Sequence, residues 1–289
     1  MKLAEMRQML SERGIQLTKS LGQNFLHEEK VVAKIAAAGE LARSDKVLEI
    51  GPGLGPLTEL LVAQAGEVLA IEMDARLVEI LRERWGAPSP SSSLQVIHAD
   101  ALKYLETEPR DWSNWKLVSN LPYSVASPIL VELALAERGP ERMVVTLQRE
   151  VAERMRAKAD EEHYGLLTLL VQLNYEPRTM FKISAGCFFP QPNVDSACLT
   201  LVRRPKPLLT PEQAKAFVRI VKQAFSQRRK MMAKLLRADW SEERVACAMN
   251  KLCLSPQIRA EAVTLEQFVE LTRLLAGDHA RGLTSAGHE

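Results

Sequence analysis

Residues 46–55 read Lys46-Val47-Leu48-Glu49-Ile50-Gly51-Pro52-Gly53-Leu54-Gly55, and this stretch decides the fold of the 289-residue chain. Its first half is a short, nearly all-apolar run, which is typical of a strand buried in a parallel sheet. Its glycines carry no Cβ, so the backbone can turn there and approach a ligand closely. A helix is predicted from Pro56 to Ala65, and strand, glycine turn and helix together indicate an α/β fold.

The alternation of strand and helix continues along the chain. Further strands are predicted over residues 67–71, 94–98, 115–119 and 142–147, and helices over 74–85, 127–138 and 150–159. Two later apolar runs, 166–174 and 196–202, have no helix between them and are predicted to be strands that close one edge, antiparallel to the rest. The expected fold is a doubly wound, Rossmann-like α/β sheet, mostly parallel with an antiparallel edge strand.

Beyond this sheet the pattern becomes helical and basic. Residues 203–207 resemble a linker, and helices are predicted over 211–225, 228–236, 242–252 and 265–275. We therefore expect a sheet domain over 1–204, a small all-α domain over 205–277 and a flexible tail over 278–289. Between Arg203 and Arg237 there are 11 Lys or Arg and one acid, although the whole chain carries only +2. This asymmetry predicts a polyanionic partner for the helical domain.

The composition excludes several classes of protein. The chain is 46% hydrophobic and 26% charged, which is typical of a soluble globular protein. Its N-terminus is amphipathic and lacks the apolar core of a secretory signal, and its apolar runs are too short to cross a membrane. Its four cysteines show neither a CxxC pair nor a histidine at zinc spacing. We expect a cytoplasmic monomer with free thiols, no metal and no membrane contact.

Polar residues stand where the predicted strands end. The glycine turn follows the first strand, Glu72 ends the second, Asp100 follows the third and Asn120 follows the fourth. Because the carboxyl ends of parallel strands meet at one rim, we expect these residues to line one ligand site. Glu72 can accept ribose hydroxyls, and Asp100 can accept from an adenine amine. Taken singly, Glu72 could be a solvated strand end and Asp100 a helix N-cap.

The glycine spacing indicates which ligand this is. A pyrophosphate fingerprint needs a third glycine where Pro56 stands, and no P-loop lysine follows. Proline also lacks the N–H that would face a phosphate. The predicted ligand is therefore a nucleoside without phosphate, S-adenosylmethionine, held beside Gly51 and Gly53. Its sulfonium cation suits the acidic rim.

The turn Asn120-Leu121-Pro122-Tyr123 is where we place the chemistry. Pro122 removes an N–H and keeps Leu121 out of helical dihedrals, so the chain turns sharply at the strand end. The turn presents an amide, backbone carbonyls and an aromatic ring close together. The exocyclic amine of a base needs this set, with acceptors for its hydrogens and a ring to stack on. An ordinary Asn-Pro turn beside a core tyrosine is the alternative interpretation.

Several ordered motifs resemble those of the ribosomal RNA adenine N6-dimethyltransferase family, over about residues 17–236. The matching stretches are Leu21-Gly22-Gln23-Asn24-Phe25-Leu26, residues 49–55, Glu72, Asp100-Ala101-Leu102, Asn120-Leu121-Pro122-Tyr123, Gln148, residues 150–152, residues 188–196 and residues 225–230. Within the family, the match is best to the bacterial small-subunit (16S) enzymes.

The resemblance implies a class I methyltransferase sheet and an RNA-binding helical domain. It implies transfer from S-adenosylmethionine to N6 of two adjacent adenines near the 3′ end of small-subunit (16S) rRNA, in a 30S precursor during ribosome biogenesis. By this resemblance, Asn24 and Leu26 close over the cofactor, and Gly51, Gly53 and Glu72 hold it. Asp100 binds the adenine of the cofactor, and Asn120 lies between the cofactor and the target base.

For the target base we expect two acceptors, Asn120 Oδ1 and the Leu121 carbonyl, to hold the amine hydrogens. Tyr123 is expected to stack on the base beside Pro122, and Phe188 to cover the other face. Phe188 could instead belong to the core.

The basic residues Arg228, Arg229 and Lys230 are expected to contact the RNA backbone, although such a charge run could also be a solvated face. Two other functions remain open. One is a large-subunit (23S) adenine methyltransferase of the macrolide-resistance type. The other is a non-catalytic assembly or RNA-binding factor.

Overall fold

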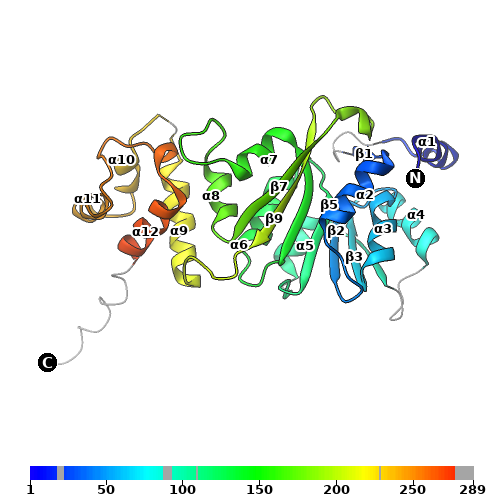
Figure 1. The fold of residues 1–289 in the computed structure, drawn as a ribbon, viewed down its shortest axis with the longest axis horizontal. Coiled ribbons are helices and arrows are strands. Elements are labelled where there is room, and N and C mark those ends of the chain that lie inside the picture. Colours follow the sequence, from blue (N-terminus) through cyan, green and yellow to red (C-terminus); the bar gives the residue numbers. More distant parts are fainter. Residues whose placement is uncertain (18–22, 87–92, 109, 228, 277–289) are drawn as a thin grey trace. The chain divides into compact units, whose positions relative to one another are not determined.

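The computed structural model of the chain describes residues 1–17, 23–86, 93–108, 110–227 and 229–276 (Figure 1). The chain forms two compact units. The first contains Met1–Ala152 and Tyr175–Arg203, and the second contains Glu153–Asn174 and Arg204–Glu289. The sequence had placed residues 153–174 in the sheet domain, but they group with the C-terminal helices.

The first unit is built on a seven-stranded sheet of order β4-β3-β2-β5-β6-β9-β7. Its strands are β2 (Lys46–Ile50), β3 (Glu67–Glu72), β4 (Leu94–His98), β5 (Trp115–Asn120), β6 (Arg142–Gln148), β7 (Tyr175–Ile183) and β9 (Ser196–Arg203). Strands β2 to β6 pair in parallel, whereas β9 runs antiparallel to both β6 and β7. The predicted mostly parallel sheet with one antiparallel strand is confirmed, but that strand is β9, which lies between β6 and β7, and β7 forms the edge.

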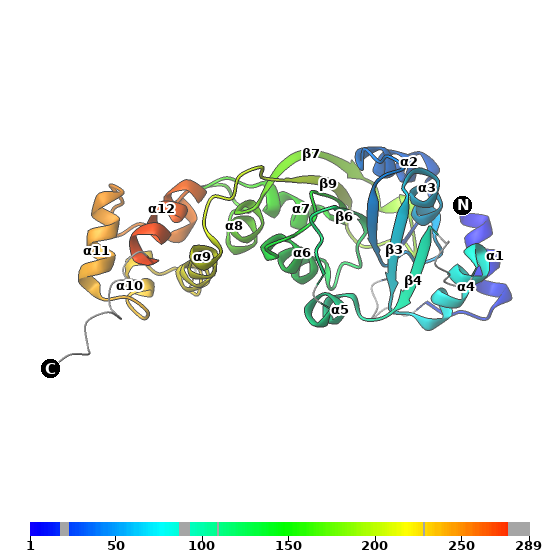
Figure 2. The same ribbon diagram turned by 90° about the horizontal axis from the view of Figure 1, so that it is seen from below.

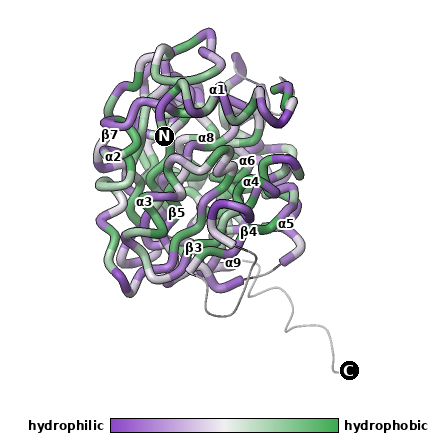
Figure 3. Tube along the Cα trace, turned by 90° about the vertical axis from the view of Figure 1, so that its right-hand side faces the viewer, coloured by the Kyte–Doolittle hydropathy of each residue, from purple (hydrophilic) through white to green (hydrophobic). Residues whose placement is uncertain are grey.

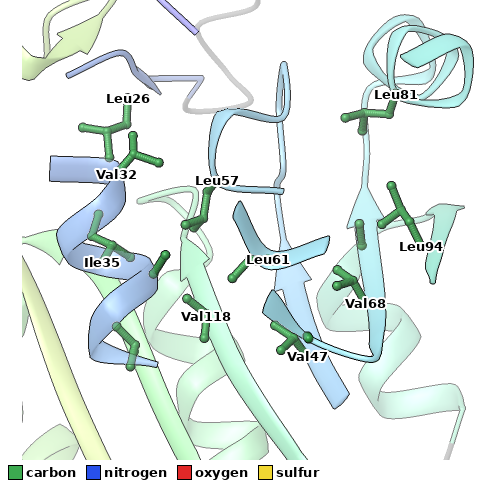
Figure 4. Packing of buried hydrophobic residues seen from close by; sticks show 14 of the residues in the cluster. Leu26, Val32, Ile35, Val47, Leu57, Leu61, Val68, Leu81, Leu94 and Val118 are labelled. Carbon is green, nitrogen blue, oxygen red and sulfur yellow. The ribbon is translucent and has the colours of Figure 1, made fainter. Parts of the chain in front are cut away.

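Helices cover both faces of this sheet (Figures 1 and 2). They are α1 (Leu3–Glu12), α2 (Glu29–Ala38), α3 (Pro56–Gln64), α4 (Ala75–Trp85), α5 (Ala101–Thr107) and α6 (Ala126–Leu135); α7 (Arg149–Arg156) follows β6. The apolar cluster under α2 and α3 includes Val32, Ile35, Leu57, Leu61, Val47, Val68 and Val118 (Figure 4). Hydrophobic residues concentrate along central strands such as β3 (Figure 3). This burial fixes the strands whose ends carry the polar residues.

The second unit is helical. Its helices are α8 (Leu166–Gln172), α9 (Pro211–Ala224), α10 (Met232–Leu236), α11 (Glu242–Lys251) and α12 (Leu265–Ala276). Phe225 stands between Tyr164 and Phe268, with ring centroids 6.4 and 6.2 Å away. The Tyr164 hydroxyl donates to the Val263 carbonyl at 2.6 Å, which ties the segment before α8 to the one before α12. Phe217 and Phe268 are completely buried.

Two sequence-based elements were wrong or missing at the antiparallel edge. Residues 166–174, predicted as a strand, form helix α8, because a short all-apolar run fits a buried helix as well as a buried strand. The strand that does lie at the edge is β7, which the sequence did not predict. Its Pro177 and its polar residues weaken the strand pattern, and the pairing with β9 is irregular between Pro177 and Met180.

A two-stranded antiparallel ribbon joins β1 (Phe25–Leu26) to β8 (Phe188–Phe189). Within the described part of the chain, no helix is both long enough and apolar enough to span a bilayer. All four cysteines are free thiols, as predicted.

The strand order reverses between β2 and β5. From β2 the chain moves outward to β3 and β4, and then it returns to β5 on the other side of β2. The loops after β2 and β5 therefore diverge and leave a crevice at the carboxyl ends of the strands, where ligands bind in open α/β sheets.

Candidate functional site

A cavity of about 250 Å³ occupies this crevice. The residues that the sequence assigned to the cofactor all line it: Asn24, Leu26, Gly51, Gly53, Glu72, Asp100 and Asn120. Leu121, Pro122 and Tyr123 line it as well. The structure thus brings together the ends of β2, β3, β4 and β5 around one space, which has the scale of a small-molecule site.

The two glycines of this turn that line the cavity, Gly51 and Gly53, are required there for steric reasons. Gly51 and Gly53 have φ of +68° and +61°, in the left-handed region that other residues avoid. A Cβ on Gly53 would lie 2.7 Å from the Phe25 ring, and one on Gly51 would lie 3.0 Å from Pro122 Cγ. Gly51 and Gly53 therefore allow both β1 and the Asn120–Tyr123 turn to approach the glycine turn closely.

Glu72 is held rigidly at the end of β3. Its Oε2 accepts from the Gly53 N–H at 3.1 Å, and its Oε1 accepts from the N–H groups of Met73 and Asp74 at 2.8 and 3.0 Å. Burial raises the pKa of this carboxyl, and the three backbone donors partly offset that rise. A carboxylate has about four lone-pair sites, so Glu72 keeps capacity for a ribose hydroxyl.

Asp100 combines its two predicted possibilities. It is the N-cap of α5, and its Oδ1 accepts from the Lys103 N–H at 3.2 Å. It is also exposed and lines the cavity. The sequence analysis named Asp100 as a possible helix N-cap but did not predict helix α5 itself.

Glu49 is a cavity residue to which the sequence gave no role. It is 1% exposed, and the Thr58 hydroxyl donates to its Oε2 at 2.7 Å. Burial raises the pKa of Glu49 to about 8, and repulsion from the Glu72 carboxylate adds to the rise. One signal could have identified it: Glu49 is a carboxylate inside an otherwise apolar, buried strand.

Asn120 has one satisfied and one unsatisfied side-chain atom. Its Nδ2 donates to the Asn24 carbonyl at 3.0 Å. Because a carbonyl only accepts, the amide must turn its NH₂ group toward Asn24. Its Oδ1 is consequently left buried without a hydrogen-bond partner among the described residues. An unpaired buried acceptor beside a cavity is what a site prepared for an N–H donor would contain.

The rest of this turn is also fixed. The Leu121 N–H donates to the Thr146 carbonyl at 3.3 Å, and Leu121 is 1% exposed. The Tyr123 hydroxyl lies 2.5 Å from Ser196 Oγ at the start of β9, which orients the half-buried ring. Burial raises the pKa of Tyr123, so the phenol stays neutral.

Phe188 does not fit its predicted role over the base. It is 3% exposed, pairs with Leu26 across the β1–β8 ribbon and packs in the apolar cluster under α2 and α3. It is also not among the residues lining the cavity. Pro190 and Pro192 follow Phe188 and favour a rigid surface loop, but β8 pairs with β1 and the Phe188 ring is buried in the core.

The predicted RNA-contacting residues belong to the second unit. Arg228 lies outside the described residues, and Arg229 and Lys230 are exposed. Arg219 nearby pairs with Asp239 at 2.6 Å. Where the chain is described, no group of three or more His, Cys, Asp or Glu side chains could hold a metal ion.

With the geometry in place, the chain can be compared with known proteins. Residues 14–277 match the family described as ribosomal RNA adenine dimethylase. The chain belongs to this family. The adenine dimethylase family accounts for the glycine turn, the acidic strand ends and the Asn120–Tyr123 turn in one chain, and the protein is a methyltransferase of this family.

Similar family members come from several bacteria. The ribosomal RNA small subunit methyltransferase A of Latilactobacillus sakei is 35% identical over 276 residues, covering 93% of each chain. The protein of the same name from Streptococcus uberis is 37% identical over 279 residues, covering 93% of this chain and 95% of the relative.

Solved structures agree with the fold. The crystal structure of 23S rRNA methyltransferase ErmE is 30% identical with a TM-score of 0.68, covering 88% of this chain and all of that one. A dimethyladenosine transferase from Plasmodium falciparum, 24% identical, has a TM-score of 0.73 and covers 86% of this chain and 95% of that one. The latter supports the fold alone.

Proposed function

We propose that this protein transfers methyl groups from S-adenosylmethionine to N6 of two adjacent adenines near the 3′ end of small-subunit rRNA, giving N6,N6-dimethyladenosine. The observation that carries the proposal is the buried Oδ1 of Asn120, which has no hydrogen-bond partner among the described residues and belongs to a cavity that Gly51 and Tyr123 also line. The names of the relatives at 35% and 37% identity support the small subunit as the source of the substrate.

The cavity residues fit S-adenosylmethionine. Gly51 and Gly53 let Phe25 and Pro122 pack against the turn that lines the cavity, and Glu72 retains one lone-pair site for a ribose hydroxyl. Asp100 is exposed toward a ligand at the neighbouring strand end. Asn24 and Leu26, on the segment around β1, close the site over the glycine turn. When bound, the cofactor supplies an electrophilic methyl group on a positively charged sulfur.

The protein must make the adenine amine a better nucleophile, since its lone pair is delocalised into the ring. We propose that the Asn120 Oδ1 and the Leu121 carbonyl each accept one amine hydrogen. Two acceptors on one side make the nitrogen pyramidal and free its lone pair. The hydrogen bonds that fix Asn120 to Asn24 and Leu121 to Thr146 hold these acceptors in advance, so little reorganisation is needed.

The base is positioned by the turn and not by Phe188. The Tyr123 ring, oriented by Ser196, offers a stacking face worth about 1–3 kcal/mol per base. Pro122 packs against Gly51 and keeps the turn next to the cofactor loop. The methylated amine is strongly acidic and loses its proton to water, so no general base is required. A second transfer then repeats with the monomethylated amine.

In the second unit, Arg229 and Lys230 are proposed to neutralise RNA phosphates. Both are exposed, as phosphate contact requires. Such contacts position the RNA without reading its sequence. The choice of the two adenines must therefore come from the shape of the target and the cavity.

The test is methyl transfer from labelled S-adenosylmethionine to isolated small and large ribosomal subunits that lack the modification. We expect label in small-subunit rRNA alone, recovered by mass spectrometry as N6,N6-dimethyladenosine. Label in large-subunit rRNA would favour the second candidate function, that of a large-subunit (23S) adenine methyltransferase. The 30% identity to the 23S rRNA methyltransferase ErmE is the reason to test this alternative. No label in either subunit would favour a non-catalytic assembly factor.

A further inference from the structure

Strands β2 and β5 do not pair along their full length. Their ladder runs from Lys46 opposite Trp115 to Leu48 opposite Leu117 and ends there. Both strands continue toward the cavity, β2 to Ile50 and β5 to Asn120. The last part of β2 and the last part of β5 therefore lack backbone bonds to each other, although β2 stays paired with β3 up to Ile50 and β5 with β6 up to Asn120.

A side chain takes over where the ladder stops. The Ser119 hydroxyl accepts from the Ile50 N–H at 3.3 Å and donates to the Ile50 carbonyl at 2.5 Å. Ser119 is completely buried and Ile50 is 1% exposed, so water does not compete for these groups. One hydroxyl thus supplies both hydrogen bonds that a facing backbone would have made.

This bridge lies between the two halves of the site. Ile50 directly precedes Gly51 of the glycine turn, and Ser119 directly precedes Asn120. The two turns also lie close together at Gly51 and Pro122, since a Cβ on Gly51 would lie 3.0 Å from Pro122 Cγ. The Ser119 bridge and this contact together join the glycine turn to the Asn120–Tyr123 turn.

We propose that Ser119 is a positioning residue whose hydroxyl fixes the distance between the glycine turn and the Asn120–Tyr123 turn, and so sets the rate of methyl transfer. This inference rests on the proposed function. Each half would still bind its own ligand without the hydroxyl, because Glu72, Asp100 and Tyr123 have separate anchors. The loss should therefore appear in kcat, since a misplacement of about 1 Å can lower a rate by up to about 100-fold.

The experiment compares Ser119→Ala with the parent protein and with Thr272→Ala. Thr272 is a matched control, because it is also completely buried and its hydroxyl donates to a backbone carbonyl, that of Phe268 at 2.8 Å. Calorimetric titration with S-adenosylmethionine counts the folded sites. Turnover on small subunits is then expressed per cofactor-binding site, so that unfolded protein does not contribute.

We expect Ser119→Ala to lower kcat per site by about tenfold, with the cofactor Kd and the KM for RNA within about threefold of the parent's and Thr272→Ala unchanged. A fall of less than fivefold, or a loss seen only in KM or Kd, would overturn the proposal. If Ser119→Ala binds no cofactor, Ser119→Cys is measured in its place and the same limits on kcat, KM and Kd apply. Cysteine is close to serine in size, and its thiol forms only weak hydrogen bonds. If the parent protein transfers no methyl groups, both the proposed function and this inference are rejected. If the parent is active and Ser119→Ala is equally active, only this inference is rejected.

Discussion

Replacing Asn120 by alanine is expected to separate stability from activity. The variant loses the hydrogen bond from Nδ2 to the Asn24 carbonyl, worth about 1 kcal/mol. It also removes Oδ1, a buried acceptor with no partner in the described part of the chain, whose desolvation costs about 1–3 kcal/mol. These effects oppose each other, so the free energy of unfolding should stay within about 2 kcal/mol of the parent's, a Tm change of a few degrees.

Methyl transfer should respond very differently. Loss of one preorganised hydrogen-bonding group lowers kcat by about 100- to 1,000-fold, and we expect that range for Asn120→Ala. The assay combines urea unfolding with turnover on small subunits. Asn114→Ala is the control, because Asn114 is exposed and directly precedes the first residue of β5, at the end of the strand opposite Asn120. Transfer within tenfold of the parent, or a stability loss above about 3 kcal/mol, would show that Asn120 is structural and refute the mechanism.

Three further predictions follow from the same geometry. Tyr123→Phe keeps the ring and loses only the bond to Ser196, so turnover should fall less than about fivefold, whereas Tyr123→Ala should fall by about 10- to 100-fold; equal defects would contradict stacking. Because burial raises the pKa of Glu49 to about 8, its neutral form stabilises the fold fully below pH 4.5 and this contribution is lost as pH rises through 8, by up to about 5 kcal/mol. Urea unfolding across this range should therefore show a pH dependence that disappears in Glu49→Gln, and its persistence would assign the effect elsewhere. Arg229→Gln and Lys230→Gln should each reduce the slope of log Kd for RNA against log salt by about 1, and unchanged slopes would exclude phosphate contact.

The sequence was most informative where local chemistry and tertiary structure agree. Strand β4 was predicted with its observed bounds, and the helix predicted to begin at Asp74 does so, since the Asp74 side chain accepts from the Arg76 N–H at the start of α4. The polar strand ends were also predicted to line one site, and they do. Parallel strands buried on both faces leave a strong apolar signal, and the turn residues that follow them are equally distinctive.

The antiparallel edge and the finer contacts could not be predicted in this way. The run Leu166–Gln172 carries no periodicity, so its own sequence does not distinguish a helix from a strand, and the run becomes a helix within the second unit. The role of Ser119 depends on where the β2–β5 ladder stops, which is a property of the sheet and not of either strand. Phe188 looked like a surface aromatic because its partner, Leu26, is 162 positions away in the sequence.

The chain leaves the first unit at residue 153, contributes α8 to the second, and returns at Tyr175 to supply β7, β8 and β9 before leaving again at Arg204. In a chimera that takes only the residues after 204 from a relative, the buried Leu169 and Val171 of α8 would pack against helices of the relative's sequence. The Tyr164 hydroxyl would likewise face the relative's segment in place of the one around Val263. A graft intended to alter which RNA is held should carry residues 153–174 along with those after 204. Any cassette cut at the linker alone would divide a hydrophobic core.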